Sequence, residues 1–179
     1  MTDQTPKPDP RALFGPPMPG DLDQPAIPGG TTEVETVTAL VPEPEIGPLV
    51  GILVEHNSNL ATMSLAETVL QEAGVPFETT VMSALLDPGK VAEYCKHARE
   101  RGLRVLIAGA GLSAALPGAA AAHTDLPVIG VPLSSHLSAA GGLDSLLSIA
   151  QMPPGVPVAT VGIDNAKNAA QLALRILSI

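Results

Sequence analysis

Aromatic side chains are scarce in this 179-residue chain: they make up 2% of it, and tryptophan is absent. A core must therefore be built from Ala, Val, Leu and Ile, whose small volumes favour close packing of helices on a sheet. Basic residues are also few, 9 Lys and Arg against 18 Asp and Glu, for a formal net charge of −9. Because nucleic-acid phosphates are bound by clustered cations, we expect no nucleic-acid partner.

Cysteine and long apolar runs are equally limited. The single cysteine, Cys95, excludes a disulfide within the chain, and its helical surroundings favour a buried helix residue over a nucleophile. No run of about 18 apolar residues and no basic-then-apolar leader is present, which predicts a cytoplasmic protein without membrane association. The four histidines and Cys95 show no metal-ligand spacing, so a metal site is not expected.

Proline is abundant, and it crowds residues 1–47. Proline removes backbone donors and blocks helix interiors, so this segment is predicted to be a largely disordered tail, and residues 48–179 to be one domain. Two patches of the tail differ from the rest, Arg11 to Phe14 and the strand-like residues 36–41. The tail is either simply solvated or docks a protein partner through Leu13 and Phe14.

From residue 49 onward, short apolar runs alternate with helical patterns. The expected strands are 49–54, 77–82, a run from Val105, 126–131 and 158–163. The expected helices are 60–73, 88–101 capped by Asp87, an alanine-rich helix from about Pro117 to Ala122, 145–151 capped by Asp144, and 166–176. This alternation predicts an α/β fold with a doubly wound parallel sheet. Ligands bind beyond the carboxyl ends of such strands, which places residues 55–59, 83–87 and 109–113 around one mouth.

Four segments within residues 49–177 closely resemble the PurE family of aminoimidazole ribonucleotide carboxylases and mutases: VLIAGAG…LPG, LPVIGVPL, LDSLLSIAQMPPGVPVATV and NAKNAAQLALRIL. The resemblance implies a flavodoxin-like three-layer sandwich and a homo-octamer with active sites at subunit contacts. It also implies transfer of a carboxylate from N5 to C4 of carboxyaminoimidazole ribonucleotide without metal or organic cofactor, whereas animal relatives use carbon dioxide directly.

The loops that touch substrate in that family are changed here. Where the family has a proton-transferring histidine and a phosphate-pairing arginine, this chain has Leu85 and Leu86, and where a second histidine stands it has Ala115. Leu112 replaces a glycine, and Glu55 brings a negative charge to the first loop, where a phosphate is expected. A carboxylate beside a phosphate would repel it by a few kcal/mol at intermediate dielectric.

These changes lead us to expect a divergent PurE-like protein that has lost ordinary mutase activity and acts as an oligomeric scaffold, regulatory or ligand-binding protein. Two alternatives stay open: an enzyme with changed chemistry on a related heterocyclic or carboxylated small molecule, or residual carboxylase or mutase activity through another residue. The catalytic candidates are His56, Glu55 and His136. The expected ligand pocket consists of polar loop residues and new apolar walls: His56, Asn57, Ser58, Asn59, Ser83, Leu85, Leu86, Gly111, Leu112 and Ser113.

Overall fold

The computed structural model describes residues 47–179. The expected tail, its Leu13 and Phe14 anchor and the strand-like patch at residues 36–41 lie outside these residues. Within residues 47–179, no helix has both the length and the apolar character needed to cross a membrane.

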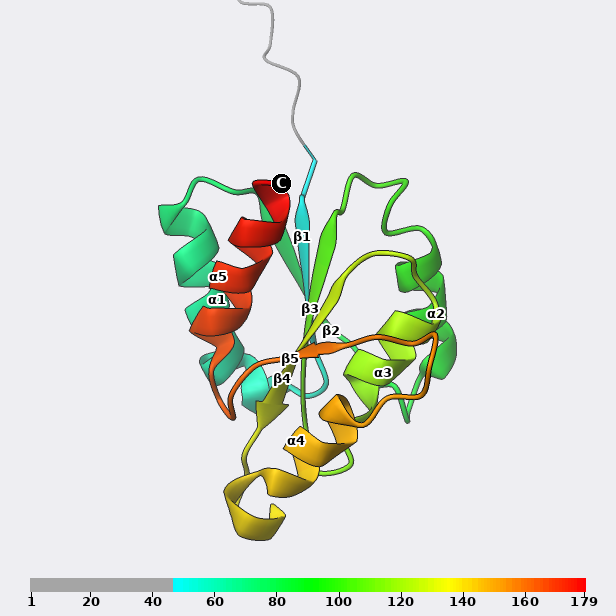
Figure 1. The fold of residues 1–179 in the computed structure, drawn as a ribbon, viewed down its shortest axis with the longest axis vertical. Helices are drawn as coiled ribbons and strands as arrows, with labels where there is room; N and C mark the ends of the chain where they lie inside the picture. Colours follow the sequence, from blue (N-terminus) through cyan, green and yellow to red (C-terminus); the bar gives the residue numbers. More distant parts are fainter. Residues whose placement is uncertain (1–46) are drawn as a thin grey trace, which may run out of the picture. The chain divides into compact units, whose positions relative to one another are not determined.

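A five-stranded parallel sheet forms the centre of the described part of the chain (Figure 1). Its strands are β1 (Val50–Val54), β2 (Phe77–Val81), β3 (Val105–Gly111), β4 (Val128–Leu133) and β5 (Ala159–Thr160). They lie in the order β2-β1-β3-β4-β5. This order is that of flavodoxin-like, doubly wound sheets, so the predicted fold class is confirmed.

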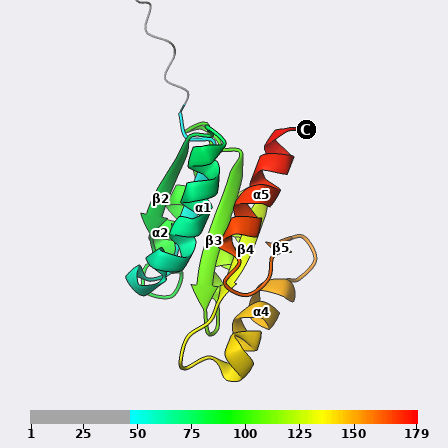
Figure 2. The same cartoon turned by 90° about the vertical axis from the view of Figure 1, so that its left-hand side faces the viewer.

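Helices cover both faces of the sheet (Figures 1 and 2). One face carries α1 (Leu60–Glu72) and α5 (Ala166–Leu177); the other carries α2 (Pro88–Lys96), α3 (Ala115–Ala122) and α4 (Leu143–Ala150). The central strand β3 supplies both cores, with Ile107 on the α1/α5 side and Leu106 on the other. Four fully buried alanines of α5, at positions 166, 169, 170 and 173, allow that helix to approach the sheet closely, as the aromatic-poor composition predicts.

Several predicted element ends are wrong. The helix expected to reach Arg101 ends at Lys96, and residues 97–102 form turns in which the Ala98 N–H donates to the Cys95 carbonyl rather than four residues back. The fifth strand covers only Ala159–Thr160, and the fourth is shifted to Val128–Leu133 because it pairs along β3 as far as Gly111.

Two helix starts also differ from expectation. The alanine-rich helix already begins at Ala115, and α4 is capped by Gly142, whose φ of 105° is left-handed. Asp144 lies inside the first turn of α4, where its carboxylate accepts hydrogen bonds from the Ala139 and Ser145 N–H groups instead of capping the helix.

A polar cluster joins α2 to the amino-terminal part of β2. The Tyr94 hydroxyl donates to Glu78 at 2.6 Å, and Arg101 donates to both Glu78 oxygens at 2.6 and 3.2 Å while its guanidinium lies 4.4 Å from the Tyr94 ring centroid. Burial, reinforced by the Glu78 hydrogen bond, raises the pKa of Tyr94 above its usual value. The neighbouring Cys95 is buried, as its helical pattern predicted, and burial raises its pKa to about 11.

Candidate active site

The loops that leave the carboxyl ends of β1 to β4 enclose a cavity of about 450 Å³, a size typical of small-molecule sites. The loops after β1, β3 and β4 each contribute several residues to its lining, and the loop after β2 contributes one. The lining residues are Glu55, His56, Ser58, Asn59, Leu85, Gly111, Leu112, Ser113, Ala114, Ala115, Ser134, Ser135, His136 and Leu137.

The loop after β1 is held to the sheet at its first residue. The Glu55 N–H donates to the Gly109 carbonyl at 3.0 Å, which extends the pairing of β1 with β3 by one bond. A single 3₁₀ turn, η2 (Asn57–Asn59), follows, and the His56 carbonyl accepts from the Asn59 N–H at 2.9 Å. The exposed His56 ring lies 3.2 Å from the Ser58 hydroxyl through Nδ1, so it borders the cavity in a defined place.

Glu55 is tied to the loop after β2. The Ser83 hydroxyl donates to one Glu55 oxygen at 2.5 Å, and the Ala84 N–H reaches the other at 3.4 Å. Ser83 in turn accepts from the N–H groups of Leu85 and Leu86, at 3.3 and 3.2 Å. The half-buried carboxylate therefore organises a neighbouring loop, which the expectation of simple phosphate repulsion did not include.

The turn that follows Gly111, the last residue of β3, lines the cavity through Leu112, Ser113 and Ala114. A Cβ at Gly111 would lie 3.0 Å from the Leu133 carbonyl oxygen, so only glycine allows β3 and β4 to stay this close there. Two non-glycine residues of the turn, Leu112 and Ala114, have left-handed φ values of 55° and 36°. Such conformations are costly for residues with a Cβ and are held by their surroundings.

The predicted pocket residues fall into two groups. Glu55, His136 and most of the predicted pocket residues line the cavity, whereas Asn57, Ser83 and Leu86 do not. The prediction missed Ala114, Ala115 and three neighbours of His136, namely Ser134, Ser135 and Leu137. The run Ser134-Ser135-His136 after a buried strand was the signal that could have revealed the last group.

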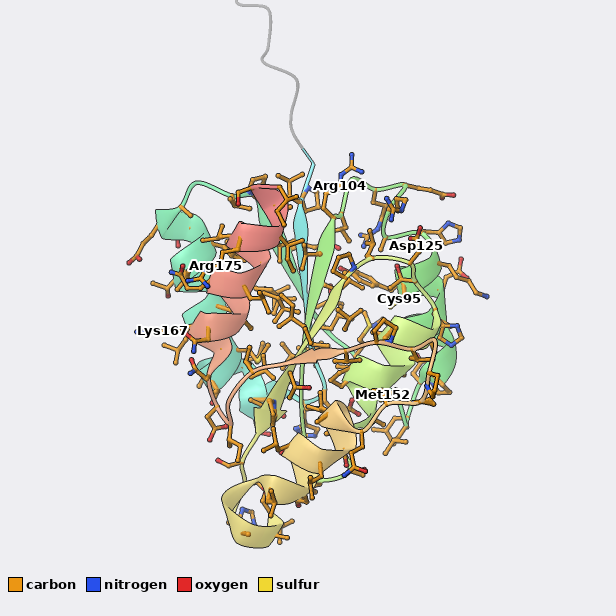
Figure 3. All side chains as sticks on the ribbon, viewed as in Figure 1. Cys95, Arg104, Asp125, Met152, Lys167 and Arg175 are labelled. Atoms are coloured by element: carbon orange, nitrogen blue, oxygen red, sulfur yellow. The ribbon has the colours of Figure 1, made fainter. Side chains whose placement is uncertain are left out.

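The cavity is poor in positive charge. Among the described residues that line it there is no Lys or Arg, and Glu55 is its one carboxylate. Figure 3 shows Arg104 at the opposite end of the sheet, before β3, and Lys167 and Arg175 on α5. Residues 47–179 hold no group of three His, Cys, Asp or Glu side chains placed to bind a metal ion.

A parallel sheet in this strand order defines an α/β protein of the flavodoxin-like class, and its cavity lies at the carboxyl ends of the strands, where proteins of this class bind ligands. Residues 49–179 match the model of the AIR carboxylase family, and the chain belongs to that family.

Several known proteins are similar in sequence to this chain over about three quarters of its length. The N5-carboxyaminoimidazole ribonucleotide mutase of Pyrococcus horikoshii is 60% identical over 132 residues, covering 74% of this chain and 73% of that protein. The mutase of Pyrococcus abyssi is 58% identical over 132 residues, covering 74% and 75%. The crystal structure of Treponema denticola PurE has a TM-score of 0.64 and 30% identity, covering 73% of this chain and 80% of that one.

These similarities correct the expectation that the chain has lost mutase activity and is a scaffold or regulatory protein. That expectation rested on Leu85, Leu86 and Ala115, yet identities of 58–60% connect the chain to proteins named as mutases. The physical error was to judge each loop position alone. The structure brings two other imidazoles, His56 and His136, to the same cavity, and imidazole is a side chain that can transfer a proton near neutral pH.

Proposed function

We propose that this chain is an enzyme that converts N5-carboxyaminoimidazole ribonucleotide by moving its carboxylate from N5 to C4. The observation that carries the proposal is the 60% identity with a protein named for this mutase activity. The cavity supports it, because it lies at the carboxyl edge of the sheet and has the volume of a small-molecule site.

The reaction requires one proton to change place. The N5–carboxylate bond breaks and a C4–carboxylate bond forms, so C4 gives up its proton and N5 gains one, with no net change in protons or electrons. A side chain that can both accept and donate a proton near neutral pH suits this transfer, and imidazole is the usual choice. We propose His56 and His136 as the candidates, since both border the cavity. Glu55, fixed by Ser83, is the third candidate of the site.

Recognition of the substrate phosphate would differ from an arginine-based site. The available donors along the cavity are the hydroxyls of Ser58, Ser113, Ser134 and Ser135 and the two imidazoles. The lack of Lys and Arg among the described lining residues favours a second candidate function, the same carboxylate transfer on a related heterocycle without a phosphate. Comparing turnover of the ribonucleotide with that of the corresponding ribonucleoside separates the two.

The test is a direct assay of purified protein with N5-carboxyaminoimidazole ribonucleotide. We expect turnover, and a loss of roughly 10²–10⁴-fold in kcat when the proton-transferring imidazole is removed by His56→Gln or His136→Gln. The matched control is His123→Gln, since His123 follows α3, is exposed and does not line the cavity. Absence of turnover by the unmodified protein on either substrate would contradict the proposed function. Full activity of both variants would contradict the assignment of proton transfer to an imidazole and leave Glu55 as the candidate.

We further infer a homo-octamer whose domain spans residues 48–179. Leu85, Leu86 and Leu137 support subunit contacts near the cavity, because 68%, 85% and 70% of their surfaces are exposed in one chain. The domain boundary is supported by the backbone bond from Leu49 to Pro76, which starts the pairing of the sheet. Light scattering should give the mass of eight 18.2-kDa chains, and a chain lacking residues 1–47 should keep its unfolding midpoint.

A further inference from the structure

The cavity wall after β4 is fastened by a residue that lies 30 positions further along the chain. Asp164, which follows β5, accepts two hydrogen bonds from Ser134: one from its N–H at 2.9 Å and one from its hydroxyl at 2.5 Å. The Asp164 N–H also donates to the Pro132 carbonyl at 2.8 Å. Three bonds of one residue therefore join the loop after β5 to the end of β4.

Asp164 makes these bonds from a left-handed backbone conformation. Its φ is 55°, in the left-handed region that residues with a Cβ rarely occupy, although Asp and Asn enter it more often than the others. Such a conformation persists only where the surroundings over-determine it, and residues of this kind gather at functional sites. Here the two hydrogen bonds from Ser134 to the Asp164 carboxylate hold the backbone in place, because hydrogen bonds to an ionised acceptor are stronger than neutral ones.

Ser134 is the first of four consecutive residues that line the cavity, and His136 is among them. The turn that follows is closed by its own serines: the Ser135 N–H donates to the Ser138 hydroxyl at 2.9 Å, and the Leu137 N–H to the Ser135 hydroxyl at 3.2 Å. These bonds shape the turn but do not attach it to the sheet. The attachment at its start is the pair formed by Ser134 and Asp164.

We propose that Asp164 is a positioning residue: through Ser134 it sets the place of the His136 imidazole against the substrate. This inference rests on the proposed function, because it requires His136 to transfer the proton. Asp164 does not line the cavity. Its effect would arise because proton transfer depends steeply on geometry, such that a displacement of about 1 Å can cost on the order of 10²-fold in rate.

Asp164→Gly is the variant that removes the carboxylate and also relieves the left-handed strain, so it should fold. We expect kcat to fall by roughly 10- to 100-fold while KM changes less than about threefold. Asp164→Asn keeps an acceptor for the Ser134 N–H and should recover most of the activity. The matched control is the next residue, Asn165→Ala: its side chain caps α5 by accepting from the Asn168 N–H at 3.2 Å, so the unfolding midpoint should drop by a few degrees with kcat unchanged.

Two further measurements separate positioning from general damage. In a His136→Gln background, Asp164→Gly should lower kcat no further, because the residue acts through that imidazole. Independently of activity, Asp164→Gly should speed hydrogen exchange of the Ser135 and Leu137 amides, whose N–H groups are hydrogen-bonded within the turn, and Asn165→Ala should not. Unchanged exchange, or an equal loss of kcat with and without His136, overturns the inference. An unmodified protein that fails to turn over either substrate overturns the proposed function instead, and the exchange result then still decides whether Asp164 fixes the loop.

Discussion

Gly130 in the middle of β4 is where the close packing of helix on sheet can be tested most directly. A Cβ built there would lie 2.3 Å from Ile149 Cγ2 on α4 and 3.0 Å from Val158 Cγ1, whereas carbon atoms in contact are about 3.5–4.0 Å apart. Ile149 is buried, and its branched side chain has few other rotamers. Replacing Gly130 with alanine therefore requires α4 to move by more than an ångström.

Overpacking of this kind typically costs 1–3 kcal/mol. Because the obstructing atom belongs to a stiff, buried side chain, we expect the upper part of that range for Gly130→Ala, about 2–3 kcal/mol. For a domain of this size, that corresponds to a fall in Tm of roughly 6–12 °C. Calorimetry or urea unfolding followed by circular dichroism would measure it.

Gly118→Ala is the matched control, since Gly118 lies in α3 and its Cβ would meet the flexible, half-buried end of Met152 at 2.8 Å. The methionine end can move, and alanine gains about 0.5–1 kcal/mol over glycine inside a helix, so this change should be neutral or stabilising.

A double-mutant cycle decides whether Ile149 is the cause. Ile149→Ala alone should cost about 2–5 kcal/mol, and the double variant should be no less stable than Ile149→Ala, because the new methyl group occupies part of the vacated space. Strictly additive costs, or a Gly130→Ala protein as stable as the unmodified one, would refute this account of the packing.

Three other predictions concern single side chains. Because burial raises the pKa of Cys95 to about 11, the native protein should react with a thiol reagent at least about tenfold more slowly than the urea-unfolded chain, and rapid native labelling would contradict the buried position. Hydrogen bonding to Glu100 and the charges of Glu93 and Glu100 raise the pKa of His97, so its NMR titration midpoint should lie above 6.5 and should fall in Glu100→Gln. The stability that the pair of His97 and Glu100 contributes is present below about pH 6.5 and is lost as the pH rises through the raised pKa of His97. Leu85→His places an imidazole on the cavity wall at the position of the family's histidine, and kcat should rise less than about tenfold because imidazoles already border the cavity; a gain of 10²-fold or more would show that they do not transfer the proton.

The fold could be predicted from the sequence because its signals are local. Strand β1 and helix α1 each begin and end within one residue of the expected positions, since an apolar run and a helical stripe ended by a glycine are properties of neighbouring residues. The errors occur where the end of an element depends on contacts with another part of the chain. The length of β5 depends on pairing with β4, and the end of α2 depends on the turn that follows Lys96, which propensity alone does not fix.

The candidate site could be predicted only in part, for a different reason. The topology brings known strand ends to one edge, so Glu55, His56 and Gly111 were predicted and line the cavity. The run Ser134-Ser135-His136 after a buried strand could have revealed that this loop lines the cavity, but not how the loop is held: the left-handed backbone of Asp164 and its long-range bonds to Ser134 have no signature in either segment alone.

The same separation of scaffold and loops explains why replaced family residues are a poor guide to lost activity. Strands β1, β3 and β4 are fully buried apart from one residue, so their sequences are fixed by packing. Leu85, in contrast, is 68% exposed on a loop held by the Glu55–Ser83 bond, and changing it costs the fold little. An acid–base group can therefore move from one loop to another around an unchanged cavity without loss of stability. The chemistry has to be judged from the whole set of side chains that the loops bring to the cavity, which here includes His56 and His136.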